Sequence, residues 1–380
     1  MKALLFGAGK IGRGFIGAVL RKSGYDICFS DVNTQLIELI NNEKQYVVHV
    51  LDINRYDELI NGVSAIHTDS KELLDNFATA DLVTTAVSMK VLPAIAPVIA
   101  NGIKHRKVIL NTTPLNIVAC ENGIRATTQL KSIVYDYLSE EERMWADKHI
   151  GFADSSVDRI VPITTYSHPL DVAVEAFYEW NVDKNQLKGV LPDIPGLHLT
   201  DDLTAHIERK LFTVNTGHCA AAFLGNISGY TYIHECLADT KLKTTIKDIM
   251  RQSGDALIAK YNFDRHAHEN YINIVLERFA NPYIKDLTSR VGHDPKRKLG
   301  PTLYFSYPIS MALSFHLPTD KLSFAIAAGM TEEIIGDPQC EEIKRLILQK
   351  GLKQAITSIT GQTDPVVIQQ ITEAYNLFHQ

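Results

Sequence analysis

The chain has few cysteines and no arrangement of them that suits a metal site or a disulfide framework. There are only five, scattered at Cys28, Cys120, Cys219, Cys236 and Cys340. Isolated thiols of this kind are typical of reduced, mostly buried side chains. No Cys/His group has the compact spacing of zinc ligands. We therefore expect no bound metal.

Positive charge and long apolar runs are lacking as well. The formal net charge of −6 at pH 7 argues against a general binder of nucleic acids. The longest apolar runs, such as 82–89, are too short to cross a bilayer. An apolar strand begins by residue 3, so we expect no signal peptide and a cytoplasmic location. No dimerisation segment is evident, which favours a monomer, with a dimer as the alternative.

A glycine-rich turn between a strand and a helix is the most specific feature near the start of the chain. Residues 2–6 predict a strand, and the run from Gly7 to Gly12 reads Gly-Ala-Gly-Lys-Ile-Gly. A helix is expected from Arg13 to about Lys22, and a second strand from residue 26 ends at Asp31. Strand, turn, helix and a following acid together make the full context of a dinucleotide-binding fingerprint.

Each part of this fingerprint has a physical role. Gly7 allows the tight turn, Gly9 lets a pyrophosphate approach the backbone, and Gly12 lets helix pack on strand. The helix N-terminus offers free N–H groups to the phosphates. Asp31 can accept hydrogen bonds from the adenosine ribose and repels a 2′-phosphate, which favours NAD over NADP, although Arg13 could reach such a phosphate. The predicted cofactor contacts are Phe6, Gly7, Ala8, Gly9, Lys10, Ile11, Gly12, Arg13, Gly14 and Asp31.

Alternating patterns over the first half of the chain predict an α/β fold with a doubly wound, largely parallel sheet of the Rossmann type. Further strands are expected at 81–87, 107–111, 133–137 and 156–163, with helices within 88–101 and over 116–131. Beyond Asp193 the patterns are helical, and Asp364-Pro365 should open a last helix. We expect a nucleotide-binding domain over 1–193 and a mainly α-helical domain over 194–380.

A second motif sets a lysine, an amide and an imidazole within nine residues. At about 100° per residue, Lys210, Asn215 and His218 fall at about 0°, 140° and 80° on a helical wheel. All three side chains can therefore face one cleft. A lysine can act as a general base when burial lowers its pKa toward about 7–8. The structural alternative is an exposed lysine, an amide near a turn and a core histidine.

Five further blocks complete a pattern that resembles the polyol-specific long-chain dehydrogenases over nearly the whole chain. They are Ala119–Gly123, Ser156–Pro162, Lys210-x4-Asn215-x2-His218, Arg278–Pro282 and Arg290–Leu299. One local departure follows Leu299, where Gly-Pro-Thr-Leu-Tyr-Phe-Ser-Tyr-Pro replaces a more charged stretch. Tyr-x-x-x-Lys is absent, which excludes the tyrosine-based mechanism of short-chain dehydrogenases.

The resemblance implies a metal-independent hydride transfer with Lys210 as general acid and base. Asn122 and Asn215 would hold the reacting oxygen as neutral donors, and His218 would position substrate hydroxyls. Asp158 would bind the substrate. For Asn122 the structural alternative is a cap of a helix or turn, and for Asp158 a salt bridge to the neighbouring arginine.

Within the family, the length implies the branch that interconverts D-mannitol 1-phosphate and D-fructose 6-phosphate. The segment 278–298 carries six cations, against Asp286 and Asp294 within it and Glu277 just before it. We expect Arg290 to bind the phosphate through its bidentate guanidinium. The main alternative is a dehydrogenase of an unphosphorylated polyol or uronate. A more distant one is an NAD(H)-sensing regulator, although the basic cluster is interrupted by prolines and does not form a recognition helix.

Overall fold

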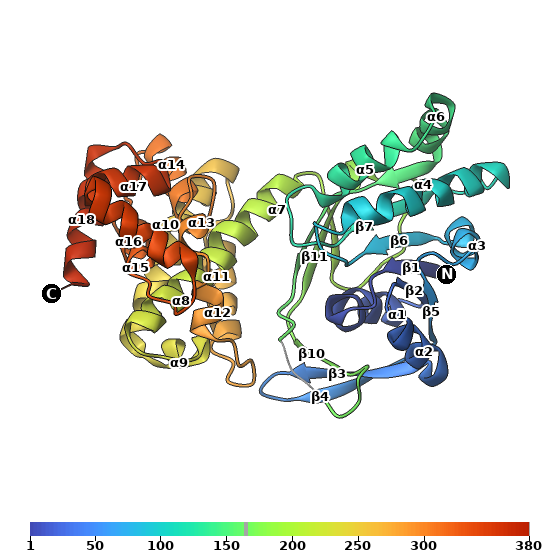
Figure 1. Cartoon of the computed structure of the whole chain (residues 1–380), viewed down its shortest axis with the longest axis horizontal. Helices are drawn as coiled ribbons and strands as arrows, with labels where there is room; N and C mark the ends of the chain where they lie inside the picture. Colours follow the sequence, from blue (N-terminus) through green and yellow to red (C-terminus); the bar gives the residue numbers. More distant parts are fainter. Residues whose placement is uncertain (163–165, 380) are drawn as a thin grey trace. The chain divides into compact units, whose positions relative to one another are not determined.

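The computed structural model describes residues 1–162 and 166–379 (Figure 1). Its backbone divides into two compact units, Met1–His206 and Ile207–Gln380. Each unit contains apolar clusters of its own. The first unit extends beyond the boundary expected at 193/194, through the strand Leu197–Thr200 and on to His206.

The first unit is built on a six-stranded parallel sheet in the order β5-β2-β1-β6-β7-β8. Its strands are β1 Lys2–Phe6, β2 Asp26–Asp31, β5 Val63–His67, β6 Leu82–Thr85, β7 Leu115–Ala119 and β8 Ile150–Phe152. This confirms the predicted doubly wound arrangement. The strand order reverses between β1 and β6, where ligands bind at the carboxyl ends of such sheets.

Both faces of this sheet are covered by helices, as expected for parallel strands with two apolar faces. In β1, Ala3 and Leu5 join one apolar cluster while Leu4 and Phe6 join the other. The helices of this unit are the π segment η1 Gly12–Gly17 continued by α1 Ala18–Lys22, then α2 Thr34–Glu43, α3 Glu72–Thr79, α4 Leu92–Val108, α5 Ala126–Asp136 and α6 Glu140–His149.

Two smaller sheets complete the first unit. One has the order β10-β3-β4 and the other β12-β11-β9. Their strands are β3 Gln45–Leu51, β4 Tyr56–Asn61, β9 Ser155–Asp158, β10 Val172–Glu175, β11 Glu179–Asp183 and β12 Leu197–Thr200, with a short 3-10 turn η2 at Lys184–Gln186. The predicted strand 156–163 is found in part, as β9, which ends at Asp158; Ile163 lies outside the described residues.

Two of the predicted strands are wrong, and the helix predicted over 116–131 is found in part, since α5 covers 126–131. The apolar run 107–111 ends helix α4 and turns at the surface, with Val108 and Leu110 both more than three-quarters exposed. Residues 116–119 belong to the buried strand β7 instead of a helix. Residues 133–136 belong to helix α5, in which Leu130 and Val134 are buried one turn apart. Short apolar runs do not distinguish a strand from a buried helical turn.

The second unit is helical, as predicted. A continuous helix passes through α7 Leu203–Arg209, the π segment η3 Lys210–Asn215 and α8 Thr216–Ile227. The remaining helices are α9 Ile233–Ala238, α10 Thr240–Tyr261, α11 Arg265–Phe279, α12 Thr288–Gly292, α13 Pro295–Lys298, α14 Ser306–Ser314, α15 Asp320–Met330, α16 Pro338–Lys350, α17 Leu352–Thr360 and α18 Pro365–Leu377.

The predicted start of the last helix is confirmed. The Asp364 side chain accepts hydrogen bonds from the backbone N–H groups of Val366 and Val367, with Pro365 in the first helical position. Such a cap satisfies N–H groups that have no partner within the helix. None of the helices in the described part of the chain is long and apolar enough to cross a membrane.

Candidate active site

The predicted cofactor loop lies at the carboxyl end of β1, beside the end of β6. Gly7 donates its N–H to Ser30 O at 2.8 Å, and Ala86 donates to Phe6 O at 2.8 Å. The loop thus sits between the first strands of the two halves of the sheet. Gly9, Lys10 and Ile11 are accessible to solvent, whereas Phe6 is fully buried.

The space around the glycines of this loop suits the binding of a dinucleotide. Gly7 has a φ of +99°, and a Cβ there would lie 2.5 Å from Ala86 O. A Cβ on Gly12 would lie 2.0 Å from Gly7 O, so this position packs helix against loop. At Gly9 a Cβ would meet nothing within 4 Å. The open side of the loop is therefore at Gly9, where a pyrophosphate is expected to approach the backbone.

Asp31 and Arg13 both bind the backbone of the loop at Ala8. Asp31 Oδ2 accepts a hydrogen bond from Ala8 N at 2.7 Å, and Asp31 remains partly exposed at the end of β2. Arg13 is buried, and its guanidinium donates to the backbone oxygens of Leu170 and Ala8. Burial lowers the pKa of Arg13. The sequence left open that Arg13 binds the 2′-phosphate of NADP. Because these donors bind main-chain oxygens instead, Arg13 no longer argues against a preference for NAD.

Asn122 lies in an exposed turn after β7, next to a buried acid. The carboxylate of Glu121 accepts hydrogen bonds from Thr85 Oγ1 at 2.7 Å and from Val87 N at 3.0 Å. Burial raises the pKa of Glu121. This side chain ties the Asn122 turn to the loop after β6, at the carboxyl edge of the sheet.

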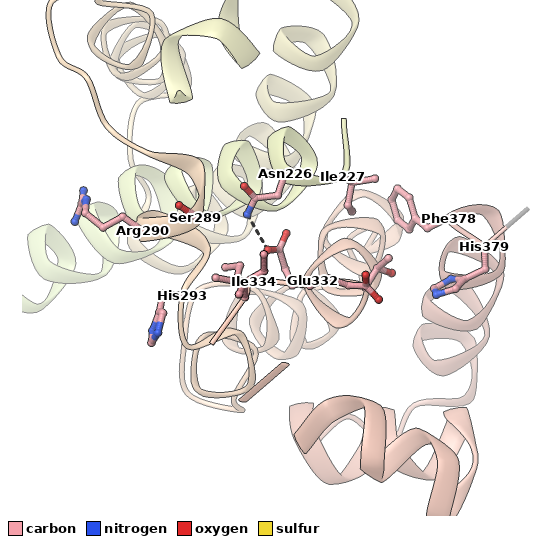
Figure 2. A pocket seen from close by; sticks show the side chains of 12 residues that line it. Asn226, Ile227, Ser289, Arg290, His293, Glu332, Ile334, Phe378 and His379 are labelled. Atoms are coloured by element: carbon pink, nitrogen blue, oxygen red, sulfur yellow. Dashed lines mark hydrogen bonds between the residues drawn. The ribbon is translucent and has the colours of Figure 1, made fainter. Parts of the chain in front are cut away.

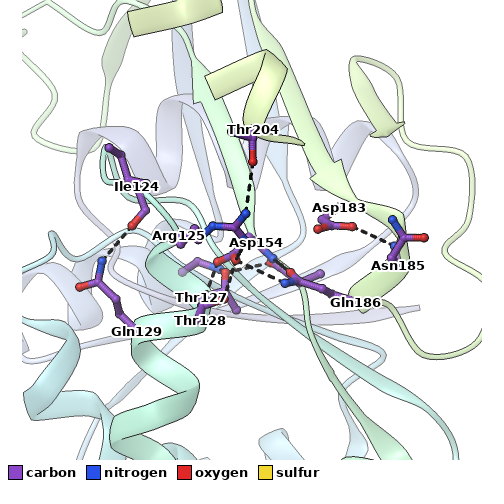
Figure 3. A network of polar contacts seen from close by, with 12 residues as sticks. Ile124, Arg125, Thr127, Thr128, Gln129, Asp154, Asp183, Asn185, Gln186 and Thr204 are labelled. Atoms are coloured by element: carbon purple, nitrogen blue, oxygen red, sulfur yellow. Dashed lines mark hydrogen bonds and ion pairs between the residues drawn. The ribbon is translucent and has the colours of Figure 1, made fainter. Parts of the chain in front are cut away.

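A second polar network fixes the other end of the same turn (Figure 3). Asp154 is fully buried and accepts hydrogen bonds from Thr128 N at 2.8 Å and Thr128 Oγ1 at 2.5 Å, in the first turn of α5. Arg125 has a positive φ of 51°, lies 3.6 Å from Asp154 and donates to Thr204 Oγ1. The turn that carries Asn122 is thus held on both sides.

Asp158 is the last residue of β9 and is buried. The Arg159 guanidinium, the partner expected in the structural alternative, donates to the backbone oxygens of Glu175 and Gly14. It also lies over the Tyr178 ring, 5.0 Å from the ring centroid. Arg159 therefore has a role of its own in joining strand to fingerprint helix, and substrate binding by Asp158 stays a prediction.

In the second unit, Lys210 and Asn215 are the first and last residues of the π segment, and His218 follows in α8. All three are partly exposed. The wheel angle of about 140° assumed an ideal α-helix and is wrong here. In a π-helix the hydrogen bonds run from i to i+5, so residues five apart follow one another along the same side. The π geometry therefore brings Asn215 toward the line of Lys210, and π turns of this kind are frequent at functional sites.

The imidazole of His218 has two neighbours that the sequence did not identify. Its ring stacks on Phe279 with centroids 4.7 Å apart, and its Nε2 lies 3.0 Å from Asp286 Oδ2. Asp286 also contacts Arg290, whose Nη2 lies 2.5 Å from Asp286 Oδ1. The structure thus joins the predicted residues His218 and Arg290 through a third side chain.

The segment that departs from the family pattern lies against the π turn. Thr216 Oγ1 donates to Tyr304 O at 2.5 Å. Burial raises the pKa of Tyr304, and the neighbouring Arg297 and Asn215 oppose that rise. Tyr304 is therefore a candidate site residue that our sequence analysis missed, although it lies in the segment we singled out as unusual.

A cavity of about 900 Å³ in the second unit opens beside α12 (Figure 2). Arg290 lines it, together with Asn226 and Glu332. Asn226 donates to Glu332 Oε2 at 2.8 Å, as the dashed line in Figure 2 shows. Burial raises the pKa of Glu332 to about 8. The cavity wall thus carries a carboxyl group that retains its proton at neutral pH.

Within residues 1–162 and 166–379, the one cluster with metal-ligand spacing is His293, Asp294 and Asp337. Asp337 Oδ2 accepts from Asp294 N at 2.7 Å and Oδ1 accepts from Gln339 N at 2.9 Å, which caps α16. None of the predicted catalytic residues belongs to this cluster. Metal independence stays a prediction.

Comparisons with known proteins agree with this architecture. Residues 1–196 match the mannitol dehydrogenase Rossmann domain, and residues 202–378 match the mannitol dehydrogenase C-terminal domain. A D-sorbitol dehydrogenase structure is similar at 14% identity, with a TM-score of 0.86 over all of this chain and 93% of the other. Mannitol 2-dehydrogenase of Pseudomonas fluorescens is similar at 18% identity, with a TM-score of 0.73 over all of this chain and 92% of the other.

These two likenesses support the fold. The two domain matches together span nearly the whole sequence, in the order that the structure shows. The chain therefore belongs to the mannitol dehydrogenase family.

Proposed function

We propose that this protein interconverts D-mannitol 1-phosphate and D-fructose 6-phosphate. As a member of its family it is a polyol dehydrogenase, and its cofactor is NAD. The Gly7–Gly12 loop has the open approach that the pyrophosphate requires, and the similar mannitol 2-dehydrogenase structure is a ternary complex with NAD and D-mannitol. Family membership favours this enzyme over an NAD(H)-sensing regulator.

The geometry of Arg290 is the observation that carries the choice of a phosphorylated substrate. Its Nε and Nη2 donate to Asp286 Oδ1 at 2.8 and 2.5 Å. Its side chain is 54% exposed, and its Nη1 makes no hydrogen bond to any residue that the structure describes. Lys298 is a second cation near Arg290. Burial lowers the pKa of Lys298, and the charges of Arg297 and Arg290 lower it further. A phosphate dianion matches this group of cations.

Each predicted site residue then has a separate role in the reaction. Lys210 takes the proton of the substrate hydroxyl in oxidation and returns it to the carbonyl oxygen in reduction. In the second unit, Asn215 donates a hydrogen bond to that oxygen without changing charge, and His218 positions other substrate hydroxyls. In the first unit, Asn122 is proposed as a neutral hydrogen-bond donor and Asp158 as a substrate contact. When bound at the Gly7–Gly12 loop, NAD would supply the acceptor for the hydride that leaves C5 of mannitol 1-phosphate.

A substrate panel tests the phosphate requirement. With NADH, we expect kcat/KM for fructose 6-phosphate to exceed that for free fructose and for uronates by about 100-fold or more, because charge-assisted hydrogen bonds contribute about 1.5–3 kcal/mol each. Arg290→Ala should raise KM for fructose 6-phosphate far more than KM for NADH. Lys241→Ala, which removes an exposed lysine from α10, is the matched control.

The ion pairs of the basic segment favour the alternative of an unphosphorylated substrate. The acids Asp286 and Asp294 lie beside Arg290 and Arg297, and Glu342 lies 2.6 Å from Lys296. These pairs neutralise part of the local positive charge. If free fructose or a uronate is reduced as efficiently as fructose 6-phosphate, this alternative replaces the phosphate proposal.

Asp31 provides a separate test of cofactor choice. We expect NAD to be preferred over NADP by a wide margin. Asp31→Asn removes the charge that repels a 2′-phosphate, so we expect it to reduce the ratio of the affinities for NADH and NADPH about tenfold. The asparagine keeps an acceptor for Ala8 N, whereas Asp31→Ser loses it and should also weaken NADH binding by about fivefold. Titration of both variants with NADH and NADPH measures this. A wild-type preference for NADP would refute the role of Asp31.

A further inference from the structure

Asp286 occupies a central position among the predicted substrate contacts of the helical unit. It lies in the segment between α11 and α12 and is only 7% exposed. Its Oδ2 lies 3.0 Å from His218 Nε2, and its Oδ1 accepts hydrogen bonds from Nε and Nη2 of Arg290. Nε2 of His218 therefore faces the carboxylate of Asp286 at contact distance.

The backbone around Asp286 is fixed by the start of α9. Ile233 N donates to Asp286 O at 2.9 Å, and Thr288 N donates to Thr231 O at 3.0 Å. A single β-bridge joins Tyr232 to Leu287 between these two bonds. Residues 231–233 and 286–288 thus form a short paired structure. This pairing fixes the position of the Asp286 backbone before any substrate binds.

The charge of Asp286 is also maintained by its surroundings. Burial alone would raise the pKa of this carboxyl, but the adjoining His218 and Arg290 hold its pKa below the ordinary value. Asp286 is thus ionised at neutral pH. A buried carboxylate with two such partners costs most when one partner is removed, which favours a single arrangement of all three side chains.

The ring of His218 is restricted from a second side. Phe279 stacks on it with an interplanar angle of 17°. A neutral imidazole carries one N–H, and an N–H at Nε2 facing Asp286 leaves Nδ1 as an acceptor. The side-on contact with Arg290 likewise uses Nε and Nη2 and leaves the Nη1 edge as a donor.

We propose that Asp286 is a positioning residue for substrate recognition. It holds His218 with Nδ1 presented as an acceptor for a substrate hydroxyl, and it holds Arg290 with the Nη1 edge presented to the anionic end of the substrate. This inference rests on the proposed function, since both partners are predicted substrate contacts. One buried carboxylate would then set the spacing between the hydroxyl-reading and anion-reading groups.

The isosteric variant Asp286→Asn tests this directly. We expect KM for fructose 6-phosphate to rise about tenfold or more, the effect of losing a charge-assisted hydrogen bond, while KM for NADH stays within about twofold and kcat falls less than KM rises. Asp337→Asn removes an equally buried carboxylate of the same unit that caps α16. It should lower the melting temperature without moving the ratio of the two KM values.

Nitrogen NMR of histidine-labelled protein supplies a readout that a merely structural role would not change. In the wild type we expect His218 in the Nε2–H form, and in Asp286→Asn a mixture of both tautomers. An Nδ1–H tautomer in the wild type would overturn the proposal, and this measurement stands even if the variant fails to fold.

Double mutants separate this proposal from the proposed function. The effect of Asp286→Asn on KM should shrink in a His218→Ala or Arg290→Ala background, because coupled residues are not additive. If those two single variants leave KM unchanged, the proposed function fails. If they raise KM but Asp286→Asn does not, or if its effect simply adds to theirs, only the role of Asp286 is refuted.

Discussion

Replacing Lys210 with alanine is expected to lower kcat by about 10³-fold while leaving the affinity for NADH within about twofold of the wild type. A positioned general acid or base contributes about 10²- to 10⁴-fold to rate, and no other side chain is proposed to move the proton of the reacting oxygen. Lys210 lies in the π segment of the second unit, whereas the cofactor loop belongs to the first. Stopped-flow turnover and fluorescence titration with NADH measure the two quantities separately.

The control for this experiment is Lys243→Ala, which removes an exposed lysine of α10 in the same unit. It should change neither quantity. Normal turnover by Lys210→Ala would refute its catalytic assignment. Loss of NADH binding together with turnover would point to altered folding, which circular dichroism and the melting temperature of the variant would reveal.

A pair of glycine variants should separate the shape of the cofactor loop from its contact with cofactor. Gly12→Ala places a Cβ 2.0 Å from Gly7 O, so the backbone must shift. We expect it to destabilise the first unit by about 1–3 kcal/mol, the usual cost of overpacking, and to abolish NADH binding. Gly9→Ala meets no atom within 4 Å in the structure. It should keep the melting temperature of the wild type yet weaken NADH binding about tenfold or more, because its methyl group occupies the approach of the pyrophosphate.

Thermal unfolding and calorimetric titration with NADH distinguish the two variants. Unchanged NADH affinity in Gly9→Ala would show that the pyrophosphate does not approach the loop there. Destabilisation of Gly9→Ala as large as that of Gly12→Ala would contradict the open space beside this residue.

Elements that are encoded by a few neighbouring residues were predicted correctly from the sequence. Elements that depend on packing against distant parts of the chain were not. The Gly7–Gly12 turn and the cap at Asp364 were found because turn and cap chemistry is encoded within a few residues. The run 107–111 was misassigned because its apolar residues lie at the surface, and strand β7 was missed because burial on both faces gives it no alternation.

The candidate site shows the same division. Lys210, Asn215 and His218 stood out by their spacing, but the π turn that changes their relative direction leaves no simple trace in the sequence. Asp286 had one available signal, its i,i+4 spacing to Arg290, which is typical of an ion pair, although Asp286 itself precedes α12. Its contact with His218 depends on tertiary folding, and no spacing rule predicts it. Tyr304 was missed for the same reason.

The most direct test of the account follows the hydride itself. The enzyme is supplied with fructose 6-phosphate and NADH carrying deuterium at C4 of the nicotinamide, and the product is analysed by mass spectrometry and NMR. We expect D-mannitol 1-phosphate with a single deuterium at C5, the former ketone carbon, and none released to water. Failure to form this polyol phosphate, or deuterium found at another carbon or in the solvent, would contradict direct hydride transfer to a phosphorylated ketose by this protein.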